Sequence, residues 1–183
     1  IEILGDAGAT VAHAPWVFAR RGIALESFAD YLDAGVNMAI GTDTAPQTML
    51  EAMRWAAVLG KGTGRDAQRS TAAQVFTAAT IGGATALGRD DLGRLAAGAK
   101  ADILSWDIGG TWMSPFRDPL KNLVYSAREE DLKTVVINGR TVMEERSIPG
   151  VDMGELGAAL QASGERLWER IPQSDWGERE VDE

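Results

Sequence analysis

The chain has 183 residues, which is enough for one domain or for a domain and part of another. Hydrophobic residues make up 45% of it, which is ordinary globular composition and argues against intrinsic disorder. The net charge of −9 argues against nucleic acid as a partner, because phosphate binding needs a basic face. The absence of cysteine excludes disulfides, thiolate zinc sites and thiol nucleophiles.

A soluble, cytoplasmic protein that does not enter a membrane is expected. The sequence contains no run of about 18 apolar residues, and no basic segment followed by an apolar one opens it. The first residue is Ile1 rather than Met, and residues 1–15 read like the middle of a fold. We therefore expect that an N-terminal part of the same protein precedes this chain.

Residues 9–40 predict a β-α-β unit of a parallel sheet. Ala9–Ala12 is short and apolar, and Pro15 ends this strand because it forces the preceding residue out of the helical region. Residues 16–22 are expected to be an irregular link. Apolar residues at helical spacing predict a helix over residues 24–34, and Val36–Ile40 is the second strand. Two strands joined through a helix run parallel.

Two helical segments are expected after this unit. The first runs over residues 48–59 and ends in a loop over residues 60–70. The second begins at Ser70, and its small residues predict close helix packing. We expect a break near Gly82 and Gly83, because paired glycines are poor inside helices.

From about residue 90 the pattern changes to antiparallel β structure. We expect one strand over Ala101–Trp106 and two more over Thr134–Ile137 and Arg140–Glu144. The dipeptide Asn138-Gly139 joins the last two and predicts a type I′ hairpin turn, because both residues accept a positive φ.

Two further stretches complete the chain. Residues 115–127 are expected to form a loop that leads into a short apolar segment. Residues 152–171 predict a terminal helix, and a charged end follows it.

The stretch VNMAIGTDTAP, from Val36 to Pro46, delivers a carboxylate at the end of a strand. Parallel α/β enzymes present catalytic groups at this end of their strands, so Asp43 could be a general base or a metal ligand. The alternative is a turn in which Asp43 caps the next helix. Thr42 and Thr44 could hydrogen-bond within such a turn or contact a ligand.

His13 is the only histidine, and it follows the strand that precedes the strand of Asp43. A lone histidine is often structural, but these two residues would lie on the same rim of a parallel sheet. They do not make a nucleophile triad, because a GxSxG elbow is absent from the sequence. One histidine and scattered acids fall short of a full set of zinc ligands, so further ligands would come from outside this chain.

Several other side chains have two roles open to them. Glu51 and Arg54 lie one helical turn apart, the spacing of a solvated ion pair. Arg20 and Arg21 are expected to be a surface pair. Four aromatic residues could line a pocket for a planar ligand or pack in the core: Trp16, Phe18, Trp55 and Trp112.

Several motifs taken together resemble the C-terminal end of an amidohydrolase-superfamily protein. They are VAHAP, then GTDTAP and EAMRWA, then AATIGGATALG with the later KAD, and finally VVINGRTV. The branch that they resemble is the cytosine-deaminase-like group, which includes atrazine-type chlorohydrolases, guanine deaminase and deaminases of adenosine derivatives. The resemblance covers roughly residues 8–145.

The resemblance implies an α/β fold that is the C-terminal part of a metal-dependent hydrolase. Residues 1–89 would hold the last two βα units of a (β/α)₈ (TIM) barrel and the helices that follow. Residues 90–150 would be the C-terminal share of a small β-sandwich domain, and residues 151–183 a C-terminal helix and charged tail.

The resemblance also implies a chemistry for the site. The aspartate of the family's GTD motif binds a divalent metal, zinc or iron, and shuttles a proton from the attacking water, and this role carries over to Asp43. His13 matches a histidine near the site, and Trp16, Thr42 and Thr44 are expected to contact the substrate or support the site with it. The family's remaining metal ligands lie on earlier strands that this chain does not contain.

The leading hypothesis is a metal-dependent hydrolase of non-peptide carbon–nitrogen bonds, as in deamination of a heteroaromatic or nucleobase-like small molecule. The complete protein is expected to be a homo-oligomer. One alternative is dechlorination by the same family. Another is that this chain alone is inactive or is a half-fold that binds a partner, because it lacks most of the metal ligands.

Overall fold

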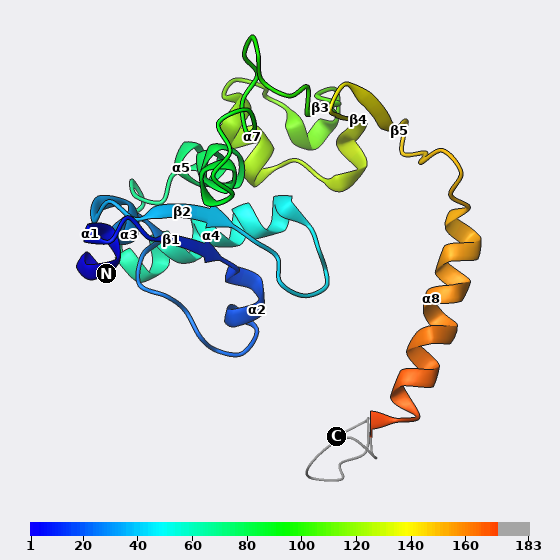
Figure 1. The fold of residues 1–183 in the computed structure, drawn as a ribbon, viewed down its shortest axis with the longest axis horizontal. Helices are drawn as coiled ribbons and strands as arrows, with labels where there is room; N and C mark the ends of the chain where they lie inside the picture. Colours follow the sequence, from blue (N-terminus) through cyan, green and yellow to red (C-terminus); the bar gives the residue numbers. More distant parts are fainter. Residues whose placement is uncertain (172–183) are drawn as a thin grey trace. The chain divides into compact units, whose positions relative to one another are not determined.

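In the computed structural model, which describes residues 1–171, the chain carries one two-stranded parallel sheet and one three-stranded antiparallel sheet within that range (Figure 1). Residues 1–146 form one unit, and a second unit begins at Ser147. The charged end expected over residues 172–183 lies outside the described residues.

The parallel sheet confirms the predicted β-α-β unit. After a short helix, α1 (Glu2–Asp6), strand β1 (Thr10–His13) pairs with β2 (Asn37–Ile40) in parallel. The ladder aligns His13 with Ile40, so the carboxyl ends of both strands lie at the same edge.

The connection between these strands differs from the prediction. Helix α2 (Pro15–Ala19) forms where an irregular link was expected, because Pro15 takes the first helical position, where its missing N–H costs nothing. Helix α3 (Phe28–Asp33) is shorter than the predicted helix over residues 24–34. Residues 24–26 instead line a cavity beside His13.

One face of the parallel sheet packs against helices. Because side chains alternate along a strand and the strands are in register, Val11 and His13 share a face with Met38 and Ile40. This face packs on α3 and on α4 (Met49–Gly64) in the hydrophobic core. The buried residues of the two helices in this core are Phe28, Tyr31, Leu50, Ala52, Met53, Ala56 and Ala57.

Helix α4 is longer than predicted. Thr48 caps its first turn by accepting a hydrogen bond of 3.0 Å from the Glu51 N–H. The helix continues through part of the expected loop and ends at Gly64, where Arg65 adopts a left-handed conformation with φ 49°. Gly60 is buried in this extension, where a Cβ would collide with the Ser70 hydroxyl.

The predicted break at Gly82 and Gly83 is wrong. Helix α5 (Ala72–Thr77) runs without interruption into a π-helical turn, η1 (Ala78–Gly82), and then into α6 (Gly83–Ala86). Gly82 sits against the Met38 carbonyl oxygen of β2, where a Cβ would collide. The Asn37 side-chain amide also donates to the Gly82 carbonyl at 3.1 Å. Gly82 therefore allows this helical segment to pack closely on β2.

The antiparallel sheet consists of β3 (Ile103–Trp106), β4 (Leu132–Ile137) and β5 (Arg140–Glu144), in that order. The hairpin between β4 and β5 is confirmed, since Asn138 and Gly139 have φ values of 50° and 78°. Two short 3₁₀ turns, η2 (Thr111–Met113) and η3 (Glu129–Asp131), lie between β3 and β4.

Part of the loop expected over residues 115–127 is a helix, α7 (Pro119–Tyr125). Asp118 caps it, and Pro119 takes its first position.

Arg54 is not paired with Glu51 in the expected way. Its guanidinium donates to the carbonyl oxygens of Val124 at 3.0 Å and Ala127 at 2.7 Å, at the C-terminal end of α7. Arg54 thus joins α4 to α7.

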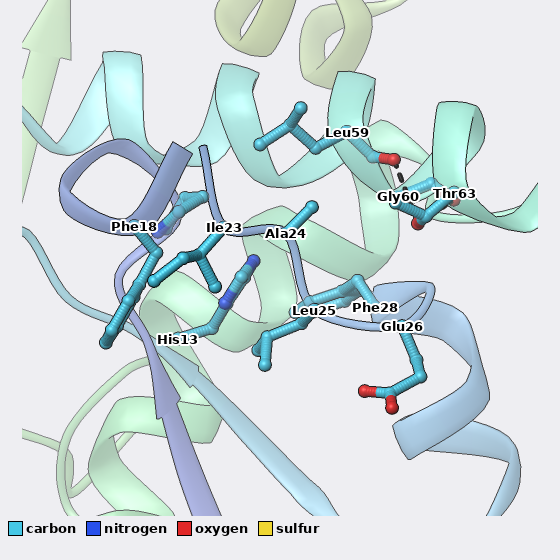
Figure 2. Close-up of a pocket in the computed structure, with 11 residues that line it drawn as sticks. His13, Phe18, Ile23, Ala24, Leu25, Glu26, Phe28, Leu59, Gly60 and Thr63 are labelled. Carbon is cyan, nitrogen blue, oxygen red and sulfur yellow. Dashed lines mark hydrogen bonds between the residues drawn. The ribbon is translucent and has the colours of Figure 1, made fainter. Parts of the chain in front are cut away.

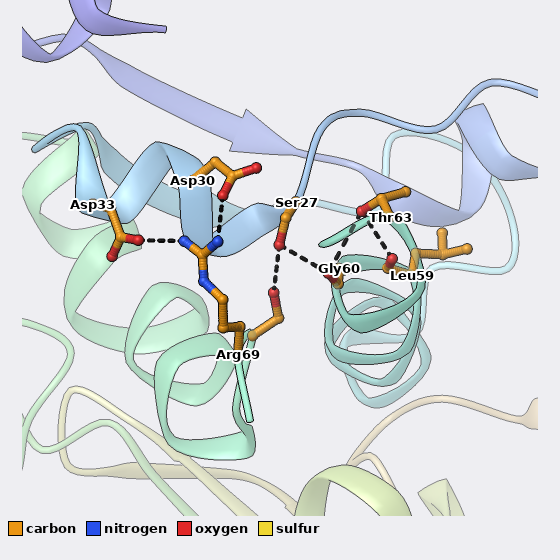
Figure 3. Close-up of polar contacts among 8 residues, drawn as sticks. Ser27, Asp30, Asp33, Leu59, Gly60, Thr63 and Arg69 are labelled. Atoms are coloured by element: carbon orange, nitrogen blue, oxygen red, sulfur yellow. Dashed lines mark hydrogen bonds and ion pairs between the residues drawn. The ribbon is translucent and has the colours of Figure 1, made fainter. Parts of the chain in front are cut away.

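A buried polar contact fixes the start of α3 to the end of α4. The Ser27 hydroxyl donates to the Gly60 carbonyl oxygen at 2.8 Å and lies 3.3 Å from the Ser70 hydroxyl (Figure 3). Beside it, the Arg69 guanidinium forms ion pairs with Asp30, at 2.7 Å, and with Asp33. The segment after α4 is therefore tied to α3 by side chains.

The second unit contains the predicted terminal helix, α8 (Met153–Trp168), which Asp152 caps through the N–H groups of Gly154 and Glu155. Among residues 1–171, no helix combines the length and apolar character that crossing a bilayer requires.

Candidate functional site

The carboxyl edge of the parallel sheet brings the predicted site segments together. The Gly41 N–H donates to the His13 carbonyl oxygen at 2.9 Å, which extends the β1–β2 ladder to the end of both strands. Asp43 follows two residues later. This is the edge at which parallel α/β proteins place functional groups, because loops diverge there.

Asp43 occupies a tight turn. Its φ is 62°, and the Thr44 N–H donates to the Thr42 carbonyl oxygen at 2.8 Å, two residues back. A positive φ with this hydrogen bond describes a classic γ-turn, which is rare and strained for a residue with a side chain. Strained backbone of this kind persists where surrounding contacts hold it, and it is concentrated at functional sites.

The Asp43 carboxylate does not cap the next helix, because Thr48 takes that position. Asp43 is exposed, and no hydrogen bond or ion pair engages its carboxylate among the contacts within residues 1–171. The helix-cap interpretation of this residue is therefore wrong. The carboxylate is available to a ligand from outside the described chain.

His13 lies at the same edge, but its ring points into the helix layer (Figure 2). His13 is 8% exposed, and the centroid of its ring lies 6.0 Å from that of Phe28. The ring borders a small cavity whose lining includes Ala24, Leu59 and Thr63. Burial lowers the pKa of His13 to about 4, because the charged form loses its hydration. The imidazole is thus neutral at pH 7, with one nitrogen as donor and the other as acceptor.

Three buried polar atoms lack a hydrogen-bond partner within the described part of the chain: His13 Nδ1, Trp16 Nε1 and Thr44 Oγ1. All three belong to residues that the sequence nominated for the site. Buried polar groups in folded proteins are nearly always paired, so each unpaired atom is a candidate for contact with a ligand or supporting group.

The four aromatic residues are not gathered into a single pocket. Trp16 packs against Trp55 of α4, with ring centroids 5.4 Å apart. Phe18 lines the cavity beside His13. Trp112 instead donates from its indole nitrogen to Asp131 at 2.9 Å, and the Arg128 guanidinium lies 4.1 Å from its ring centroid.

The sequence did not indicate a role for Arg20, which was expected to be a surface residue. Its guanidinium donates to the carbonyl oxygen of Ala45, two residues after Asp43, at 3.4 Å. Arg20 and Ala45 are 25 positions apart and share no motif, so no pattern in the sequence predicts their contact.

The residues at this edge fit part of a metal site. A carboxylate oxygen such as those of Asp43 is a common ligand of zinc and other divalent ions. Within residues 1–171, however, no three His, Asp or Glu side chains cluster closely enough to hold a metal ion. Asp43 therefore fits as one ligand of a set that requires further donors.

The sequence matches the model of the amidohydrolase family over residues 2–142. The chain is 36% identical over 155 residues to a 5-methylthioadenosine/S-adenosylhomocysteine deaminase of Acetivibrio thermocellus, covering 82% of this chain and 36% of that relative. It is 37% identical over 165 residues to the deaminase of the same name from Moorella thermoacetica, covering 87% of this chain and 39% of that relative. The chain thus spans less than half the length of these curated relatives.

Solved structures of similar fold carry zinc. An adenosine deaminase from Xanthomonas campestris with bound zinc has a TM-score of 0.85 and 30% identity, over 90% of this chain and 38% of that one. An atrazine chlorohydrolase from Arthrobacter aurescens complexed with zinc has a TM-score of 0.74 and 28% identity, over 88% of this chain and 37% of that one. The family match covers most of the chain, and the chain belongs to the amidohydrolase family.

Proposed function

We propose that the protein containing this chain is a metal-dependent hydrolase that removes the amino group from a heteroaromatic ring of a nucleoside-like small molecule. The observation that carries this proposal is the Asp43 carboxylate, which is exposed at the carboxyl edge of the parallel sheet and engaged by no contact within residues 1–171. A carboxylate held in a strained turn, without a capping role, is consistent with a metal ligand and proton carrier.

Asp43 would hold a divalent ion, zinc or iron, through one carboxylate oxygen. The ion would supply Lewis-acid activation of water at neutral pH. The second carboxylate oxygen of Asp43 would accept a proton from the attacking water and return it to the departing amino nitrogen. Because the amino nitrogen has then gained a proton, the carbon–nitrogen bond breaks with release of neutral ammonia. Without that proton, the leaving group would be an amide anion, which leaves far less readily.

The neighbouring residues would orient the substrate and support Asp43. The neutral His13 would act from the helix layer, as a supporting residue behind the edge of the sheet. The Trp16 indole N–H is a donor only, and the Thr44 hydroxyl is both donor and acceptor, so these two atoms suit the ring nitrogens and hydroxyls of a nucleoside-like ligand. Thr42 would contribute to the shape of the turn.

We propose further that β1 and β2 are the last two strands of a (β/α)₈ barrel and that β3, β4 and β5 belong to a β-sandwich. A parallel sheet of two strands is at the lower end of the usual size range, and parallel sheets normally lie buried between layers of helices, which supports completion by strands from the rest of the protein. The further metal ligands would come from that missing part.

Deamination is favoured over dechlorination by the sequence comparison. The curated relatives described above are named as deaminases, and among the solved structures the adenosine deaminase matches with 30% identity and a TM-score of 0.85, against 28% and 0.74 for the chlorohydrolase. The chlorohydrolase remains the second candidate because its fold also matches with a TM-score of 0.74. Release of ammonia from 5-methylthioadenosine and release of chloride from a chlorotriazine, measured side by side, separate the two reactions.

The test is Asp43→Asn in the whole protein. We expect turnover to fall at least about a hundredfold, because the variant loses both a charged ligand and the proton carrier. Asp6→Asn is the matched control, since Asp6 is an exposed aspartate at the end of α1. Turnover of Asp43→Asn equal to that of Asp6→Asn would remove Asp43 from the site.

A further inference from the structure

The γ-turn at Asp43 needs contacts on both sides to keep its geometry. A residue with φ of 62° in such a turn is held in a sparsely populated conformation, which persists only where neighbouring contacts determine it. Within the turn, one backbone hydrogen bond joins Thr44 to Thr42. On either side of the turn, hydrogen bonds within residues 1–171 engage Gly41 and Ala45.

The N-terminal side of the turn is anchored by the sheet. Gly41 donates to the His13 carbonyl oxygen at 2.9 Å, and the ladder behind it fixes the direction in which β2 ends. A backbone rung of this kind does not depend on the identity of the side chains, so substitutions have little leverage on it.

The C-terminal side of the turn is anchored by a side chain. The Arg20 guanidinium, at the C-terminal end of α2, donates to the Ala45 carbonyl oxygen at 3.4 Å. One guanidinium nitrogen makes this hydrogen bond, which is long, and its charge makes the contact more favourable than a neutral donor would at the same distance. Both residues are exposed, so the contact adds little to global stability, and its effect is local to the segment that carries Asp43.

We propose that Arg20 is a positioning residue, which holds the turn from Thr42 to Pro46 so that the Asp43 carboxylate keeps the direction needed for binding metal. The inference rests on the proposed function of Asp43. The neighbouring Arg21 is also exposed, and its side chain makes no hydrogen bond or ion pair among the contacts within residues 1–171. It provides a control of equal charge, one position away.

The experiment compares Arg20→Gln, Arg20→Lys and Arg21→Gln in the whole protein. Three quantities are measured: zinc affinity by competition with a chelator, kcat and KM for deamination, and hydrogen exchange at the Thr44 amide. Removing a residue that supports a metal ligand weakens metal binding by about tenfold or more. We therefore expect Arg20→Gln to bind zinc about tenfold more weakly, with lower kcat, unchanged KM and faster Thr44 exchange.

Arg20→Lys keeps a cationic donor and is expected to lie between the wild type and Arg20→Gln in zinc affinity, while Arg21→Gln matches the wild type. Equal zinc affinities and equal Thr44 exchange rates in all three variants overturn the proposal. Thermal midpoints of the three variants are expected to agree, and a fall confined to Arg20→Gln would assign Arg20 a structural role instead. If the wild type binds no zinc, the proposed function fails, and Thr44 exchange alone then decides whether Arg20 holds the turn.

Discussion

The backbone N–H of Gly41 donates a 2.9 Å hydrogen bond to the carbonyl oxygen of His13, and this bond joins β2 to β1 two residues before Asp43. The ring of His13 is buried against Phe28 of α3, on the helix side of the sheet. One backbone hydrogen bond therefore joins the strand that carries the buried His13 ring to the strand that leads to the exposed Asp43 carboxylate.

Burial of His13 predicts a loss of stability on acidification. Its pKa in the folded chain is lowered to about 4 from an ordinary value of 6.5. As the pH falls below 6.5, the unfolded chain takes up a proton on this residue before the folded chain does. The free energy of unfolding then falls, by roughly 3 kcal/mol once the pH is below 4, and this residue adds no pH dependence above 6.5.

Urea unfolding of the whole protein and of His13→Gln, at about pH 7 and about pH 4.5, measures this effect. Other groups titrate over the same range, so the comparison is the difference between the two proteins. From about pH 7 to about pH 4.5, the urea concentration at the unfolding midpoint is expected to fall further in the wild type than in His13→Gln. Equal losses would show that His13 is not buried in its neutral form.

The adjacent glycines of the η1–α6 segment predict opposite outcomes. A Cβ at Gly82 would collide with the Met38 carbonyl oxygen, which is backbone and cannot move aside cheaply, whereas the nearest atom to a Cβ at Gly83 is 4.0 Å away. Gly82→Ala should lower the free energy of unfolding by roughly 1–3 kcal/mol. Gly83→Ala should be neutral or stabilising by up to about 1 kcal/mol, since alanine is the better helix former. Thermal unfolding of both variants tests the pair, and equal midpoints would contradict the close packing.

The local features of the fold could be predicted because their causes are local. Asn138-Gly139 requires no distant partner to favour a hairpin, and the end of β2 at Ile40 follows from a short apolar run that Gly41 closes. The break expected at Gly82 failed for the opposite reason. The benefit of that glycine lies in its contact with Met38, 44 positions away, and helix propensity takes no account of such a contact.

The candidate site was predictable to the level of strand ends and not beyond. The pattern placed Asp43 and His13 at one edge, but it could not say that the His13 ring turns toward α4, because that depends on which face of the sheet the helices cover. Arg54 and Arg20 show the same limit, since each donates to backbone carbonyls that no spacing rule identifies.

The buried hydroxyl of Ser27 predicts a measurable contribution to stability. It donates to the Gly60 carbonyl oxygen at 2.8 Å, and Ser27 is 1% exposed. Ser27→Ala leaves that buried carbonyl oxygen without this donor, so the free energy of unfolding should fall by about 1–3 kcal/mol. Thr63→Ala is the comparison. The Thr63 hydroxyl also reaches the Gly60 carbonyl oxygen, but at 3.5 Å, and its shorter hydrogen bond of 3.0 Å goes to Leu59 on an exposed part of α4, so this variant should change stability by about 0.5 kcal/mol or less. Similar decreases in the free energy of unfolding of both variants would contradict a stabilising role for the buried Ser27 hydrogen bond.

Metal removal separates the whole protein from this chain. The whole protein is expected to lose deaminase activity on treatment with a chelator and to regain it when zinc is added, because the metal supplies the activation of water. The purified 183-residue chain should bind zinc no more tightly than its Asp43→Asn variant, since a single carboxylate is one ligand of an incomplete set within residues 1–171. Equilibrium dialysis with zinc measures both. Tight binding by the chain alone that depends on Asp43 would mean that its own residues complete the ligand set.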